Sequence, residues 1–251
     1  MKQLICAALA VLVLEAISHA APAPVPGAQP APAATASPVP APAPWVENRN
    51  YFLIKVPRKP DVPAGKVEVT EVFSYACPAC NSFLPTMQKL QASLPPNAVL
   101  DYVPAAFNTA EDWPMFQQAY CTAQALGIAD ANHVAVFDAV WGSGELAVVD
   151  TATGRLKPRQ PTIDDAARFY EKHAHVPAAK FVATAKGFQV DTCVRRDEDL
   201  VKAYMVDSTP TLIVNGKYRI TAQSAGVGAP PDQTPTRIIE LVRYLVARES
   251  H

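Results

Sequence analysis

The 251-residue sequence is 49% hydrophobic, which suffices for one large domain, or one domain with an insertion, and excludes disorder throughout the chain. Its 22 Lys and Arg residues nearly balance 23 Asp and Glu residues, so the formal net charge is −1. A chain without an overall positive field is not drawn as a whole to nucleic acid or anionic lipid, and we expect no nucleic-acid partner. Two counts stand out: 25 prolines against 10 glycines, and an odd number of cysteines, five.

Residues 1–20 have the layout of a secretory signal peptide. Lys2 precedes an apolar run over residues 4–14, and Ser18-His19-Ala20 places small residues before a cleavage site. The run is about half the ~20 residues that a transmembrane helix needs, so we expect cleavage; an uncleaved signal anchor is the alternative. Cleavage removes Cys6 and leaves four cysteines, an even number that suits a disulfide-permissive compartment.

Residues 21–44 contain nine prolines and nine alanines, with no charged or aromatic residue. Nothing in this segment can bury a core, and proline both fixes φ and removes a backbone donor. We expect a semi-rigid, polyproline-like tether that would hold the domain away from a membrane if the signal stayed uncleaved.

The folded part begins near residue 45. Alternating and β-branched residues predict strands, and apolar residues at helical spacing predict a helix, in the order strand 51–56, strand 66–73, helix 77–93 and strand 98–103. Strand, helix and strand at these lengths indicate a βαβ unit, which we assign to residues 45–110.

Residues 111–206 change to helical character, with helices expected over 115–126, 132–141, 163–173, 178–186 and 191–206. Aromatic side chains such as Trp141 are expected to fill the core of this segment. Strands return at 211–214 and 217–220, joined by Asn215-Gly216, which favours a type I′ hairpin turn. An amphipathic helix over 236–248 completes a ββα unit, assigned to residues 207–251.

Cys77-Pro78-Ala79-Cys80 directly follows an apolar strand and begins a helix. The spacing brings the two sulfurs within bonding range, and the free N–H groups at the helix N-terminus stabilise a thiolate at Cys77. Cys80, one turn further along, would be the more buried resolving thiol. The alternatives are half a zinc site, for which no second ligand pair stands at suitable spacing, and an inert disulfide. We expect a redox pair and no metal.

Three segments together resemble the DsbA family of exported bacterial dithiol oxidases, within the thioredoxin superfamily. They are Phe73-Ser-Tyr-Ala-Cys77-Pro-Ala-Cys80, Ser208-Thr-Pro-Thr211 and Val214-Asn-Gly-Lys-Tyr218. The resemblance implies a thioredoxin fold with an inserted all-helical domain, the organisation expected above. It also implies a periplasmic location, reduced exported proteins as substrates and reoxidation by a quinone-linked membrane protein of DsbB type.

The resemblance assigns supporting roles to Thr209, Pro210 and Glu71. In the family the bond before this proline is cis, and the residue before it pairs with an extended substrate segment beside the sulfurs; a proline that merely starts a strand is the alternative for Pro210. Glu71 lies on an apolar strand, where burial would raise its pKa and suit it to exchange a proton with Cys80. The alternative for Glu71 is a carboxylate on a solvent face, since Glu68 and Glu71 must point to opposite faces.

The sequence departs from the family at two places. Ala79 stands where the best-known members have histidine, which removes one source of thiolate stabilisation and favours a less oxidising protein. Cys121 and Cys193 fall in predicted helices, where a free cysteine behaves as a small hydrophobe. In an oxidising compartment we instead expect them to form a structural disulfide, closing a loop of about 70 residues and stabilising the fold by about 4 kcal/mol.

The sequence as a whole predicts a monomeric, exported thiol-disulfide oxidoreductase that introduces disulfides through the Cys77-Cys80 couple. No flavin or nicotinamide motif is present, so we expect no bound cofactor. The alternatives are a disulfide reductase or isomerase, and a non-catalytic peptide-binding module with a structural CxxC.

Overall fold

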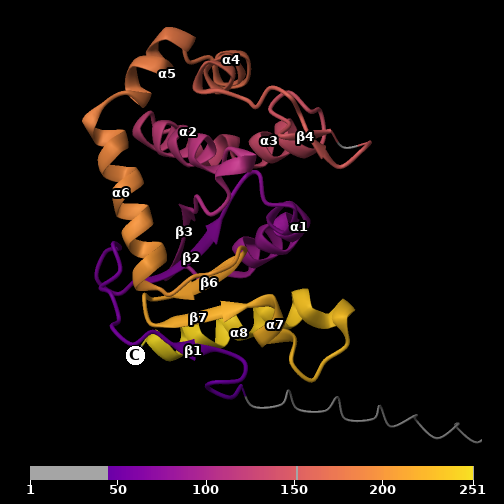
Figure 1. Ribbon diagram of the computed structural model, residues 1–251. Helices are drawn as coiled ribbons and strands as arrows, with labels where there is room; N and C mark the ends of the chain where they lie inside the picture. The colour runs from indigo at the N-terminus through magenta and orange to yellow at the C-terminus, as the bar shows by residue number, and fades with distance from the viewer. Residues whose placement is uncertain (1–44, 151, 251) are drawn as a thin grey trace, which may run out of the picture. The chain divides into compact units, whose positions relative to one another are not determined.

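The computed structural model describes residues 45–150 and 152–250. The expected signal peptide and the Pro/Ala-rich tether lie outside the described residues. A five-stranded mixed sheet occupies the centre, with strand order β1-β7-β6-β2-β3 (Figure 1). The bounds are β1 Phe52–Leu53, β2 Val67–Phe73, β3 Ala98–Pro104, β6 Thr211–Val214 and β7 Tyr218–Thr221.

The expected βαβ unit is present: β2 and β3 pair in parallel, and α1 (Pro78–Ser93) connects them. β2 also pairs antiparallel with β6, so it is a central strand with hydrogen-bonded neighbours on both sides. All seven of its residues are buried. Strands buried on both faces carry few polar residues, which makes the two glutamates of β2 exceptional.

β6 and β7 form the expected hairpin through Asn215 and Gly216, whose φ angles of 52° and 63° are those of a type I′ turn. A Cβ at Gly216 would lie only 2.2 Å from the Arg58 carbonyl oxygen. Glycine is therefore required both by the turn and by the close passage of residue 58. The helix α8 (Thr234–Glu249) follows and completes the ββα unit.

Helices cover both faces of the sheet (Figure 1). α1 and α8 pack on one face, where Val69 and Phe73 of β2 join the larger hydrophobic core. α6 (Phe188–Ala203) packs on the other face against Val72 and Val103. Because side chains alternate along a strand, Glu71 points to the α1 side and Glu68 to the α6 side.

Four further helices follow β3 in the chain and precede α6. They are α2 Trp113–Ala125, α3 Ala129–Trp141, α4 Ile163–Ala174 and α5 Ala178–Ala185. Among the described residues, no helix has the length and apolar character that crossing a membrane requires.

The sequence prediction differs from the structure in detail. The first strand was expected over 51–56, but only Phe52 and Leu53 pair with β7. α2 starts two residues before the expected position, because Pro114 is tolerated in a first helical turn, whose N–H groups have no helical partner. The short hairpin of β4 (Val149–Asp150) and β5 (Arg155–Leu156) and the one-turn helix α7 (Ala222–Gly226) were not expected.

Candidate active site

Cys77 is the N-cap residue of α1. Its backbone is extended, with φ −81° and ψ 116°, and its Sγ accepts a hydrogen bond from the Cys80 backbone N–H at 3.3 Å. Pro78 follows in the first turn, where it needs no hydrogen-bond partner. Ser74 holds the preceding loop, since its carbonyl accepts the Cys77 N–H and its hydroxyl accepts the Ala76 N–H. The loop therefore fixes the Cys77 sulfur over the positive end of a helix.

Both cysteines of the pair are free thiols in this structure and are buried. The pKa of Cys77 is lowered to about 6, chiefly by its hydrogen bond with the Cys80 thiol. Burial opposes this shift, whereas Thr209 and the backbone N–H groups of Cys80 and Ala79 add to it. Burial, followed by the interaction with Cys77, raises the pKa of Cys80 far above its ordinary value. One thiolate and one thiol thus coexist at neutral pH, with the charge on Cys77.

Glu71 lies on β2, six residues before Cys77, and only 2% of its surface is exposed. Burial raises its pKa to about 8, and the negative charge of Cys77 contributes. The sequence left open whether this carboxyl faces solvent; the structure places it inside. Glu68, on the opposite face, is buried as well, because α6 covers that side of the sheet.

Thr209 and Pro210 lie beside Cys77, although they are about 130 residues away in the chain. The bond between them is cis. Cys77 Sγ lies 3.6 Å from the Thr209 carbonyl oxygen, to which it can donate a hydrogen bond in its protonated form. The structure therefore brings together Cys77, Cys80 and the backbone of Thr209.

The loop before Cys77 also contacts α3, which the sequence analysis did not foresee. The indole Nε1 of Trp141 donates a 2.8 Å hydrogen bond to the Tyr75 carbonyl oxygen, and the Tyr75 hydroxyl lies 3.1 Å from His133 Nδ1. Burial lowers the pKa of His133 to about 4, so the ring is neutral at pH 7. The expectation that Trp141 only fills a core was incomplete. The sequence did contain a signal for this contact: Trp141 ends a predicted helix, and the indole N–H of a half-buried tryptophan requires a hydrogen-bond acceptor.

Cys121 of α2 and Cys193 of α6 are joined by a disulfide, with an S–S distance of 2.11 Å and a Cα–Cα distance of 5.8 Å. Neither residue belongs to the CxxC loop. The four cysteines of the described chain thus form one dithiol pair and one disulfide.

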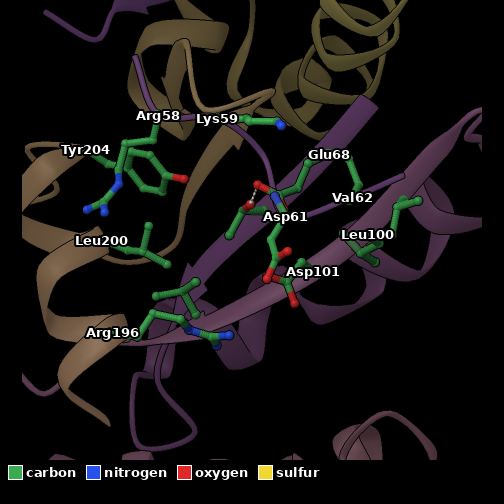
Figure 2. Close-up of a pocket in the computed structure, with 13 residues that line it drawn as sticks. Arg58, Lys59, Asp61, Val62, Glu68, Leu100, Asp101, Arg196, Leu200 and Tyr204 are labelled. Atoms are coloured by element: carbon green, nitrogen blue, oxygen red, sulfur yellow. Dashed lines mark hydrogen bonds between the residues drawn. The ribbon is translucent and has the colours of Figure 1, made fainter. Parts of the chain in front are cut away.

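A separate hollow of about 320 Å³ lies on the α6 side of the sheet (Figure 2). Glu68 and Asp101 project into it from neighbouring strands, and Arg196 projects from α6. Glu68 accepts the backbone N–H of Asp61 at 3.2 Å, and burial raises its pKa. Neither Cys77 nor Thr209 lines this hollow, so it is distinct from the thiol pair.

Comparison with known proteins shows which families this chain resembles. A family model described as thioredoxin matches residues 62–226. The curated thiol:disulfide interchange protein DsbA of Pseudomonas aeruginosa is 30% identical over 185 residues, which is 74% of this chain and 77% of that protein. DsbA of Bordetella parapertussis is 33% identical over 178 residues, or 71% of this chain and 77% of that protein.

Solved structures extend the similarity to the whole fold. A DsbA variant from Pseudomonas aeruginosa superimposes with a TM-score of 0.67 at 29% identity, covering 82% of this chain and 98% of that one. DsbA from Xylella fastidiosa gives 0.65 at 30% identity, covering 80% and 95%. The expected fold class, a thioredoxin fold with a helical insertion, is confirmed. The chain belongs to the DsbA family of thiol:disulfide oxidoreductases within the thioredoxin superfamily.

Proposed function

We propose that this DsbA-family protein introduces disulfides into exported proteins through the Cys77-Cys80 couple. The observation that carries the proposal is the position of Cys77 Sγ at the N-cap of α1, where the Cys80 N–H and thiol both stabilise its thiolate. A stabilised thiolate is a good leaving group, so the disulfide form is readily reduced by a substrate.

The reaction transfers two electrons from substrate to protein. A substrate thiolate attacks Cys77 Sγ of the Cys77-Cys80 disulfide, the S–S bond breaks, and its electron pair goes to Cys80 Sγ. Cys80 takes up a proton because its pKa is strongly raised, and the neutral carboxyl of Glu71 is the buried donor. A second substrate thiolate then attacks the substrate sulfur of the mixed disulfide, which releases Cys77 as a thiolate and leaves the substrate oxidised.

Substrate would bind as an extended segment beside Thr209 and Pro210. The Thr209 carbonyl lies within 3.6 Å of the Cys77 sulfur, which places a backbone acceptor next to the reacting atoms. A DsbA from Proteus mirabilis has been solved with a non-covalently bound peptide. A polypeptide substrate beside Thr209 and Pro210 of this chain agrees with the half-buried positions of both residues.

We further propose that the protein acts as a monomer in the periplasm after cleavage at the end of residues 1–20. A quinone-linked membrane protein of DsbB type would then restore the Cys77-Cys80 disulfide. The signal-like N-terminus and the lack of a flavin or nicotinamide motif in the sequence support this part of the proposal.

The reduction potential of the Cys77-Cys80 couple, measured against glutathione redox buffers, separates an oxidase from a reductase. We expect a potential clearly more oxidising than the value of about −270 mV typical of thioredoxin. A potential near that value would rule out the oxidase. Ala79 leads us to expect a less oxidising protein than relatives with histidine there.

Single substitutions test the assigned roles of the two cysteines. Cys80→Ser should accumulate a mixed disulfide with a disulfide-bonded test peptide, because the Cys77 thiolate attacks the peptide disulfide and no Cys80 thiol remains to resolve the adduct, whereas Cys77→Ser should form none. Non-reducing gel electrophoresis and mass spectrometry would detect the adduct. Equal adduct formation by both variants would contradict the roles, and full activity of Cys77→Ser would favour a non-catalytic peptide-binding module.

A further inference from the structure

The disulfide between α2 and α6 has a buried carboxyl at its sulfurs. Asp197 Oδ2 lies 3.5 Å from Cys121 Sγ and 3.6 Å from Cys193 Sγ. Asp197 has no exposed surface. Cys193 and Asp197 are four residues apart on α6, so their side chains share one helix face.

The two oxygens of Asp197 have different surroundings. Oδ1 accepts hydrogen bonds from the Arg196 guanidinium at 2.9 and 3.0 Å. Among the described residues, the two sulfurs are the only hydrogen-bond partners of Oδ2. Sulfurs in a disulfide carry no hydrogen, so Oδ2 can take part in a hydrogen bond there only as a donor, with the proton on the carboxyl.

The surroundings also provide acceptors for the reduced thiols. Gln124 Oε1 lies 3.3 Å from Cys193 Sγ, and the amide nitrogen of Gln124 is engaged with the Tyr120 hydroxyl. After reduction, a Cys193 thiol would donate to Gln124 and a Cys121 thiol to Asp197. The site can therefore satisfy both the disulfide and the dithiol.

The two sulfurs differ in access. Cys121 is 1% exposed, whereas Cys193 is half-buried. Both line a hollow of about 240 Å³ together with Gln124 and Arg196. An incoming thiol would reach Cys193 more readily than Cys121.

We propose that Cys121–Cys193 is a second thiol-disulfide exchange site, in which Cys193 is the attacked sulfur and Asp197 supplies the proton to Cys121. The arrangement resembles the CxxC site, where both sulfurs are buried and the buried Glu71 influences both of them electrostatically. The substrate class is a small dithiol or a protein dithiol that acts as reductant.

The exchange would transfer two electrons from the dithiol to the Cys121–Cys193 disulfide. A dithiol thiolate attacks Cys193 Sγ, the Cys121–Cys193 bond breaks, and its electron pair goes to Cys121 Sγ. The proton of Asp197 Oδ2 moves to that sulfur, and the resulting carboxylate remains paired with Arg196. The second thiolate of the reductant then attacks the reductant sulfur of the mixed disulfide with Cys193. The reductant becomes a disulfide, and Cys193 is released as a thiolate that takes a proton from solvent.

The charges around Asp197 determine the pH range of this step. Burial raises its pKa to about 7, Arg196 of α6 opposes the shift, and Asp101 of β3 adds to it. The Tyr120 hydroxyl of α2 also faces this region and is neutral, because its pKa is raised. The proton is therefore held by Asp197 up to about pH 7 and lost above it.

The test uses the full chain with Cys77→Ser and Cys80→Ser, so that only the second disulfide can exchange. Dithiothreitol is added without denaturant between pH 5.5 and 8.5, and free thiols are alkylated and counted by mass spectrometry. We expect complete reduction in the folded protein. The rate constant per dithiothreitol thiolate should be constant below about pH 7 and fall about tenfold per pH unit above it.

Asp197→Asn in the same background should reduce at least tenfold more slowly at pH 6 and lose the pH dependence. Asp199→Asn, at an exposed position on the same helix, is the matched control and should leave the rate unchanged. Circular dichroism verifies the fold of each variant. If Asp197→Asn does not fold, the pH profile of the chain that retains Asp197 remains decisive.

Two results would overturn the proposal: reduction of the pair only in denaturant, or a rate per thiolate that is independent of pH and of Asp197. Neither result bears on the Cys77-Cys80 chemistry, because those cysteines are absent from the assay. In a chain that retains Cys77 and Cys80, Asp197→Asn should leave the oxidation of a test peptide unchanged.

Discussion

Glu71 and Asp197 are buried carboxyl groups whose raised pKa values make the stability of the fold depend on pH. Each is neutral at mildly acidic pH because burial disfavours its charged form. The negative charge of Cys77 adds to the raised pKa of Glu71, and Asp197 lies within 3.6 Å of both disulfide sulfurs. The native state consequently holds protons that the unfolded chain would release. Such groups make the folded state less stable as pH rises between the unfolded and the folded pKa.

Glu71→Gln tests this linkage at the CxxC site. The pKa of Glu71 rises from 4.5 to about 8 on folding, so its stability cost is absent below about pH 4.5, grows as pH rises and is complete above about pH 8. The neutral variant should match the parent near pH 4.5 and be more stable at pH 8.5, by on the order of a few kcal/mol. Urea unfolding of both reduced proteins at the two pH values measures the difference.

The control for that comparison is Glu240→Gln, an exposed residue of α8, which should change stability equally little at both pH values. A Glu71→Gln effect that did not depend on pH would show that its carboxyl is not held neutral. The variant should also slow the exchange reaction, since Cys80 would lose its buried proton donor.

At the scale of elements, α3 and α2 both contact the CxxC loop, and the hydrogen bonds to Tyr75 come from α3. Trp141, the last residue of α3, donates to the Tyr75 carbonyl, and His133 of the same helix contacts the Tyr75 hydroxyl. The His133 ring packs against Tyr102 of β3, with the ring centroids 4.1 Å apart. α3 therefore restrains the loop through both the backbone and the side chain of Tyr75.

Trp141→Phe removes the indole N–H and leaves the Tyr75 carbonyl without this donor. We expect a loss of about 1 kcal/mol in stability. The loop that positions Cys77 over the α1 N-terminus would also be less restrained, so the pKa of Cys77 should rise above its value of about 6. Thiolate absorbance at 240 nm, followed against pH in the reduced protein, measures that pKa.

Trp113→Phe is the matched control for this prediction. Its indole donates to Glu111 at 3.2 Å and makes no hydrogen bond to the CxxC loop. The control should lose stability without shifting the Cys77 titration. If both variants shifted it equally, the effect would reflect general loosening of the fold and not the contact from α3.

At the scale of the whole molecule, the Cys121–Cys193 disulfide joins α2 to α6, and α6 in turn packs on the sheet. The bridge spans 72 residues of sequence. Replacing both cysteines with alanine should lower the free energy of unfolding by about 4 kcal/mol, the loop-closure entropy that the unfolded chain regains. Urea unfolding with the CxxC pair kept oxidised measures this loss.

The comparison variant is Cys77→Ala with Cys80→Ala. That pair encloses only two residues, so its removal should cost little loop entropy. An unchanged stability in the variant lacking Cys121 and Cys193 would contradict a stabilising disulfide, independently of whether the bond also exchanges with dithiols.

Local signals in the sequence account for much of the fold. Asn215-Gly216 predicts its turn because few other dipeptides adopt two positive φ angles, and the CxxC motif after an apolar strand predicts a helix start at residue 77 or 78. The length of strand β1 was overestimated. Whether the residues of an apolar segment form strand hydrogen bonds depends on the neighbouring strand, which here is β7.

By itself, the sequence indicated the family through the resemblance of its motifs, and spacing and local conformational preference predicted the order of the main strands and helices and a candidate redox pair. Only the tertiary structure decided which carboxyls are buried beside sulfurs. Strand alternation placed Glu68 and Glu71 on opposite faces, but α6 covers one face and α1 and α8 cover the other, so both are buried. Asp197, in a run of charged residues typical of a solvated helix face, lies against a disulfide because Cys121 reaches it from another helix. Burial and proximity arise from segments far apart in the chain, and no local pattern encodes them.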